Sequence, residues 1–241
     1  MASECETGKE PAESNINGYP QRRMGVRRMD IIQLIKGRKA GRNVDTSSVT
    51  LVRTPTSTVV MDSGSGDIRE ELLGSIENNG IMLEKVNVLV TSRADKLHTG
   101  NDDLFVHALQ HLRIEDWSKV AGAAKRRIAI NNRYHWIDRY LRLDVLPFPD
   151  GGSLALLIHV PKREEDLEPA SRHLAGKVVL LAGFSVESKD HPDVVKALDR
   201  IRRGDVTRMD HSRNGFRDLE ELLAYCDHVV PAYGDMFNVR E

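Results

Sequence analysis

Short runs of β-branched and apolar residues, each bounded by turn-forming residues, recur along the chain. Residues 49–52 and 58–61 form two such runs, and the Thr-Pro-Thr-Ser sequence between them is typical of a hairpin turn. The same pattern predicts further strands at residues 29–36, 86–92, 153–161, 177–186 and 227–237. Residues 126–148 are less regular and indicate strand pieces and turns, with core positions at Ile128, Ile130, Trp136, Ile137 and Leu141.

Helical spacing of apolar residues appears in four segments, at residues 67–80, 101–112, 191–204 and 215–226. In the first of these, Asp67 is expected to cap the start of the helix and Gly80 to end it. The second segment would place its apolar residues on one side of a helix: Leu104, Phe105, Ala108, Leu109 and Leu112.

The order of these elements favours two layers of sheet covered by helices over a simple alternation of strands and helices. The chain has 241 residues, which is enough for one α/β (α+β) domain with a sizeable core. We expect this domain to span residues 29–241. Residues 1–20 form an acidic, polar tail that is expected to be disordered, because it has few apolar residues to bury.

A basic segment at residues 21–28 follows the tail and contains Arg22, Arg23, Arg27 and Arg28. It indicates either solvated flanks of the first strand or an anionic partner such as RNA. The net charge of −1 gives the whole chain no general attraction to nucleic acid or to an anionic membrane.

Cysteine content and hydropathy point to a reducing compartment. The two cysteines, Cys5 and Cys226, suggest neither a structural disulfide nor a zinc cluster. No apolar run approaches the roughly 18 residues that would span a bilayer. The N-terminus is polar and lacks the pattern of an export signal, so we expect a cytoplasmic protein without membrane contacts.

Five stretches in order carry a resemblance to a known family: TVVMDSGSG, VNVLVTS with HTGNDDLF, SLALLIHV, KVVLLAG and CDHVVPAYGDMF. Together they resemble the metallo-β-lactamase fold superfamily, and more narrowly its small single-domain proteins that end in a Val-Pro-Gly-His-Gly-type loop. The resemblance implies an αββα sandwich with one or two metals at the edge where strand ends meet. It also implies a metal-activated water that attacks an ester, amide, thioester or phosphodiester.

The ligand positions of that family are mostly changed here. Its signature loop has the form Thr-His-x-His-x-Asp-His-x-Gly-Asn, and alignment on Gly100-Asn101 leaves only His98 as a matching ligand. The two earlier histidines correspond to Arg93 and Asp95, and the aspartate corresponds to Leu97. The remaining ligand positions correspond to Pro149, Phe184 and Tyr233.

The resemblance implies a supporting role for Asp62, which would hold the loop by hydrogen bonds. Arg93 would place a cation where a dication should sit, and one imidazole with one carboxylate cannot hold a catalytic zinc tightly. We therefore expect no metal, with Asp95 and His98 as the only weak candidates. Arg93 and Asp95 are expected to form an ion pair, and His98 to be hydrogen-bonded beside Asp62 or Asp95.

A displaced ligand set is the alternative to metal loss. It would draw on Asp62, Asp95, His98, Tyr233 and His211, with Asp150 near the third-histidine position after a one-residue shift. His107 and His111, four residues apart on the expected helix, are a weaker pair of ligands.

Three hypotheses on function follow. The first is a pseudoenzyme that acts as a binding or structural module, with a protein partner or a second copy of itself and no cofactor. The second is a hydrolase with a rearranged site that holds zinc or another divalent metal. The third is RNA binding through the basic segment.

Overall fold

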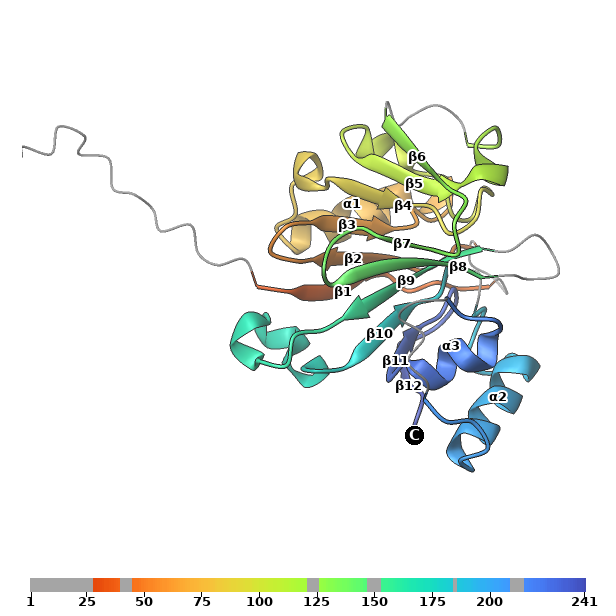
Figure 1. The fold of residues 1–241 in the computed structure, drawn as a ribbon. Helices are drawn as coiled ribbons and strands as arrows, with labels where there is room; N and C mark the ends of the chain where they lie inside the picture. Colours follow the sequence, from red (N-terminus) through yellow and green to blue (C-terminus); the bar gives the residue numbers. More distant parts are fainter. Residues whose placement is uncertain (1–27, 40–44, 121–125, 147–152, 184–185, 209–214) are drawn as a thin grey trace, which may run out of the picture.

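The computed structural model describes residues 28–39, 45–120, 126–146, 153–183, 186–208 and 215–241. The acidic tail and the basic segment up to Arg27 lie outside these ranges, so both stay predictions. Two six-stranded sheets form the centre of the molecule. Figure 1 shows them stacked as two layers, with α1 beside the first sheet and α2 and α3 beside the second.

The first sheet has the order β1-β2-β3-β4-β5-β6. Its first three strands are antiparallel, as the predicted hairpin requires, and β3 to β6 run parallel. The strands are β1 (Asp30–Ile35), β2 (Val49–Arg53), β3 (Thr58–Met61), β4 (Val88–Val90), β5 (Leu109–Arg113) and β6 (Arg126–Ile130).

The second sheet has the order β12-β11-β10-β9-β8-β7. All neighbouring strands are antiparallel except β10 and β11, which run parallel. The strands are β7 (Tyr134–Trp136), β8 (Leu141–Leu146), β9 (Ser153–His159), β10 (Val178–Leu181), β11 (His228–Val230) and β12 (Phe237–Asn238).

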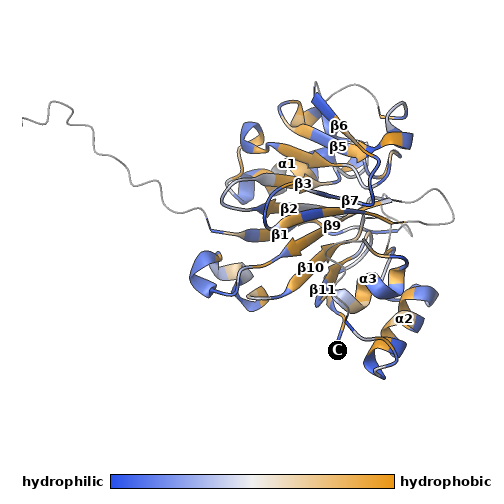
Figure 2. Ribbon diagram, in the orientation of Figure 1, coloured by the Kyte–Doolittle hydropathy of each residue, from blue (hydrophilic) through white to orange (hydrophobic). Residues whose placement is uncertain are grey.

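Three apolar clusters hold the layers together. One lies between the sheets, one under α1 (Arg69–Asn78), and one under α2 (Pro192–Arg202) and α3 (Leu219–Tyr225). In Figure 2 the central strand β10 has the hydrophobic colour, whereas α2 has both hydrophobic and hydrophilic stretches. This pattern is expected for buried strands and for a helix with one face in solvent. The αββα sandwich is therefore confirmed.

The predicted helix at residues 101–112 is wrong. A short 3₁₀ turn covers Asp102–Phe105, and the chain then forms β5, which pairs with β4 and β6. His111 lies in β5 and His107 precedes the strand, so the two are not on one helix face. Apolar runs of this length fit a helix or a buried strand equally well. Pairing on both sides decides for the strand, because it satisfies the backbone on both edges.

Two smaller expectations are also corrected. Asp67 does not cap α1, because it lies in a 3₁₀ turn (Gly66–Ile68) that precedes the helix, and the capping position falls on Ile68. Trp136 is not a core residue, since it is 41% exposed on β7, the edge strand of its sheet. Gly80 follows α1 with a positive φ of 60°, as expected of a residue that ends a helix.

Among the residues that the structure describes, no helix has the length and apolar character needed to cross a membrane.

Candidate functional site

The ends of strands from both sheets meet at one edge of the sandwich. Asp62 follows β3, Ser92 follows β4 and Gly183 follows β10. The backbone of Ser92 accepts a hydrogen bond of 3.0 Å from Leu154 at the start of β9. A β-carbon on Gly183 would lie 2.3 Å from the β-carbon of Ser92, so only glycine allows this approach.

Asp62 holds the start of the loop that follows β4. Its carboxylate accepts hydrogen bonds from the backbone N–H (2.8 Å) and the hydroxyl (2.7 Å) of Ser92. Asp62 has a φ of 58° and is 1% exposed, so a strained backbone is kept in place by these bonds. Burial raises the pKa of Asp62 to about 6, although the charge of His98 and the bonds from Ser92 oppose this shift. The geometry of Asp62 therefore fits the role that the resemblance implies, which is to hold the loop by hydrogen bonds.

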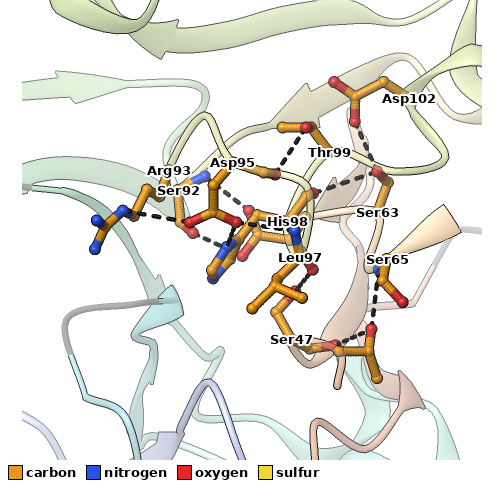
Figure 3. Close-up of polar contacts among 12 residues, drawn as sticks. Ser47, Ser63, Ser65, Ser92, Arg93, Asp95, Leu97, His98, Thr99 and Asp102 are labelled. Atoms are coloured by element: carbon orange, nitrogen blue, oxygen red, sulfur yellow. Dashed lines mark hydrogen bonds and ion pairs between the residues drawn. The ribbon is translucent and has the colours of Figure 1, made fainter. Parts of the chain in front are cut away.

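Arg93, Asp95 and His98 form a chain of contacts in the loop (Figure 3). The Nε of Arg93 lies 3.3 Å from one carboxylate oxygen of Asp95, and the Nδ1 of His98 lies 2.7 Å from the other. Asp95 is half-buried, and desolvation opposes its ionisation. The hydrogen bond to His98 and the charges of His98 and Arg93 outweigh that effect, so the pKa of Asp95 is lowered. Both expected pairings are therefore present in the structure.

His98 is buried, with 1% of its surface exposed. Desolvation alone would lower its pKa. The nearby charge of Asp62 and the hydrogen bond to Asp95 outweigh desolvation, so the pKa of His98 is raised. The imidazole thus lies between the carboxyl groups of Asp62 and Asp95, and both favour its protonated form.

Gly100 and Asn101, which end the loop, hold it against the turn that follows β3. A β-carbon on Gly100 would lie 2.1 Å from the backbone nitrogen of Gly66, so the turn needs glycine. The buried side-chain amide of Asn101 donates to the carbonyls of Ser63 (2.9 Å) and Ser65 (2.7 Å). These contacts give Gly100 and Asn101 a structural role that does not depend on a metal.

Tyr233, which the resemblance aligned with a histidine, lies near the same network. It is 8% exposed and follows β11, and the ammonium of Lys39 lies 5.0 Å from the centre of its ring. Burial, together with the charges of Glu187 and Asp95, raises the pKa of Tyr233 to about 12. The phenol therefore stays neutral at physiological pH and is a poor metal ligand.

The other predicted positions lie outside the described residues: Pro149, Asp150, Phe184 and His211. At the described positions the donor set does not fit a catalytic metal. Arg93 brings a cation, Leu97 brings an alkyl chain and Tyr233 brings a neutral phenol, which leaves only Asp95 and His98 as possible donors at these positions. Within the described ranges no group of three His, Cys, Asp or Glu residues could hold a metal ion.

Asp102 is a buried acid that the sequence reasoning missed. It is 5% exposed and accepts hydrogen bonds from the hydroxyl of Ser63 (2.7 Å) and the side-chain amide of Gln110 (2.8 Å). Desolvation raises its pKa to about 7 against these two bonds. Nothing in the sequence separates it from the adjacent Asp103, which lies on the surface and pairs with Arg69. Only the pairing of β5 places Gln110 against it.

The stability of the protein should depend on pH through Asp102. An acid whose folded pKa is raised holds more protons in the folded state, so its contribution to stability is lost as pH rises from about 4 to 7. Asparagine does not titrate. The free energy of unfolding of Asp102→Asn, relative to that of wild type, should therefore rise by about 3 kcal/mol from pH 5 to pH 8. Urea unfolding at each pH measures this difference.

Asp103→Asn is the matched control for this experiment. Its hydrogen bond to Arg69 lowers the pKa of Asp103, so this group stays ionised throughout the same interval. Its stability relative to wild type should not change between pH 5 and pH 8. Parallel pH curves for wild type and Asp102→Asn would contradict the assignment of Asp102 as a buried, high-pKa acid.

Comparison with known proteins supports the fold. No family model matches the sequence, and no curated protein matches it. Solved structures do match. A Thermotoga maritima protein assigned as a metallo-β-lactamase is 15% identical, with a TM-score of 0.61, and the match covers 88% of this chain and 99% of that one.

Two further structures are similar over most of their length. A B3 metallo-β-lactamase with an active-site glutamic acid is 14% identical, with a TM-score of 0.52, over 81% of this chain and 79% of that one. The metallo-β-lactamase SMB-1, in complex with mercaptoacetic acid, is 12% identical, with a TM-score of 0.51, over 86% and 81%. Sequence identities this low support a shared fold and do not support a shared activity. The two stacked sheets, the flanking helices and these matches agree that the protein adopts the fold of the metallo-β-lactamase superfamily.

Proposed function

We propose that this protein is a non-catalytic metallo-β-lactamase-fold module that binds a protein partner or a second copy of itself. The observation that carries the proposal is the internal pairing at the former metal site. Asp95 contacts both Arg93 and His98, and Asp62 is occupied by Ser92. A divalent metal at His98 would meet the positive charge of Arg93, and Asp95 could join it only by giving up its contact with Arg93 or with His98.

Thermal unfolding in the presence of zinc tests this proposal. A metal that binds the folded state stabilises it and so raises the melting temperature. At a metal concentration 100 times the dissociation constant, the free energy of unfolding rises by about 2.7 kcal/mol. We expect no rise for wild type with zinc, manganese or iron at micromolar concentration. The His98→Ala variant should respond in the same way as wild type. A rise in wild type that disappears in His98→Ala would contradict the proposal.

A hydrolase is the second candidate, because Asp62, His98 and Asp102 all have raised pKa values and lie close enough in the fold for the charge of Asp62 to act on the other two. Clustered shifts of this kind are common at active sites. The burial of His98 argues against it, since a side chain 1% exposed has little contact with a substrate in solution. Turnover of 4-nitrophenyl acetate or bis(4-nitrophenyl) phosphate that His98→Ala and Asp95→Ala abolish would favour this candidate over the module.

A further inference from the structure

A second candidate site lies at the edge of the first sheet that is remote from Asp62. There the turn between β2 and β3 meets the segment after α1, and the two line an open cavity of about 220 Å³. Asp62 follows the opposite end of β3, so the former metal site and this cavity are at opposite ends of the strand. The lining of the cavity includes three cations, an acid and two apolar side chains: Arg28, Arg53, Lys85, Glu168, Ile81 and Met82.

The charges around the cavity are mainly positive. Three of its lining residues are cations and one, Glu168, is an acid. Arg53 is paired with Asp30 at 3.0 Å, although its buried Nε–H has no acceptor among the described residues. Within the described ranges no carboxylate lies within ion-pair distance of Arg28 or Lys85. Arg28 and Lys85, from separate chain segments, therefore bring positive charge to the cavity that no described carboxylate pairs with, and Glu168 is the one acid in the lining.

One wall of the cavity is apolar. Ile81 and Met82 follow the end of α1, and Met82 is 54% exposed, which is unusual for a side chain of this type. An exposed methionine beside cationic groups suits a ligand with an apolar part and an anionic part. The volume is smaller than that of pockets for drug-sized ligands, so the ligand or its bound portion must be small.

We propose that this cavity binds a small organic phosphate monoester, with the phosphate near Lys85 and Arg28 and the apolar group against Met82. A phosphate monoester carries a charge of about −1.5 to −2 at neutral pH, which matches two cations that are not locally neutralised. Arginine and lysine are the side chains that most often bind phosphate. This site is independent of the proposed loss of catalysis at the former metal site.

An amide-resolved NMR titration of the full chain with phenyl phosphate tests the site. We expect saturable shifts of the amide signals of Ile81, Met82 and Lys85. Inorganic phosphate, which lacks the apolar ring, and phenol, which lacks the phosphate, should each bind about tenfold more weakly than phenyl phosphate. Saturation by inorganic phosphate at the same concentration as phenyl phosphate would reduce the site to a surface charge effect and overturn the proposal. Absence of saturable shifts at millimolar phenyl phosphate would also overturn it.

Removing a positive and a negative charge at the cavity should change the affinity for phenyl phosphate in opposite directions. Lys85→Gln should weaken phenyl phosphate binding about fivefold, whereas Glu168→Gln should tighten it about twofold, because it removes a repelling charge. Met82→Ser should weaken it about threefold. Lys196→Gln, on α2 and away from the cavity, is the matched control and should bind as wild type does. Equal affinity of Lys85→Gln and wild type would overturn the assignment.

Discussion

Replacing Asp144 with alanine is expected to lower the free energy of unfolding by about 3–5 kcal/mol, because it removes one partner of a buried ion pair. Asp144 and Arg142 lie two residues apart on β8, and both are buried with 0% exposure. Their guanidinium and carboxylate groups are joined by two hydrogen bonds of 2.7 and 2.8 Å. The variant would leave the buried guanidinium without this bidentate partner.

The surroundings of Arg142 make this loss large. Its guanidinium carbon lies 5.2 Å from the ring centre of Tyr134 and 5.3 Å from that of Phe216, so aromatic rings keep water away. Burial raises the pKa of Asp144, although the hydrogen bond and charge of Arg142 lower it. The desolvation cost is therefore high, and the pair as a whole adds little net stability.

Two controls separate the pair from its surroundings. The double variant Arg142→Met/Asp144→Leu should be much closer to wild type than Asp144→Ala, because no buried charge is left behind. Asp235→Ala breaks the exposed pair with Lys36 and should cost no more than about 1 kcal/mol. Urea unfolding measures all four proteins. A loss for Asp144→Ala no larger than that for Asp235→Ala would contradict the assigned burial of the pair.

The triple variant Arg93→His/Leu97→Asp/Tyr233→His is expected to bind zinc at least about 100-fold more tightly than wild type. It replaces a cation, an alkyl chain and a neutral phenol with three groups that zinc accepts, beside the existing His98. Asp95 already contacts the Nδ1 of His98 at 2.7 Å, and a carboxylate in this position orients a metal-binding imidazole. Isothermal titration with zinc measures the gain.

The same triple variant with His98→Ala added is the matched control and should lose most of the zinc affinity. Circular dichroism would establish that both variants are folded before titration. If the triple variant is folded and binds zinc no better than wild type, the three substituted positions do not form the former metal site. The correspondence of Arg93, Leu97 and Tyr233 with the family's ligands would then be wrong.

The parts of the fold that local pattern determines were predicted well. The β2–β3 hairpin and the strands β4, β9 and β10 are short apolar runs whose pattern is typical of strands, and α2 has clear helical spacing. The strand β5 was missed because its residues are buried on both faces and its hydrogen bonds go to β4 and β6, which are distant in sequence. Long-range pairing of this kind has no local signal.

The candidate site shows the same division. Motif spacing located Asp62, Arg93, Asp95 and His98, because they follow two strands whose ends meet. It did not locate Asp102, whose burial depends on Gln110 from β5. The apolar pattern also placed Trp136 in the core, since an aromatic residue in a strand gives no sign that the strand is at the edge of its sheet.

Elemental analysis of the wild-type protein tests the central claim most directly. The protein would be purified without chelators from cells supplied with zinc, manganese and iron, then freed of loosely bound ions by gel filtration. The pairing of Arg93, Asp95 and His98 predicts far less than one equivalent of any of these metals per chain. One equivalent of a metal that survives gel filtration, and that is lost in His98→Ala, would contradict the loss of the metal site.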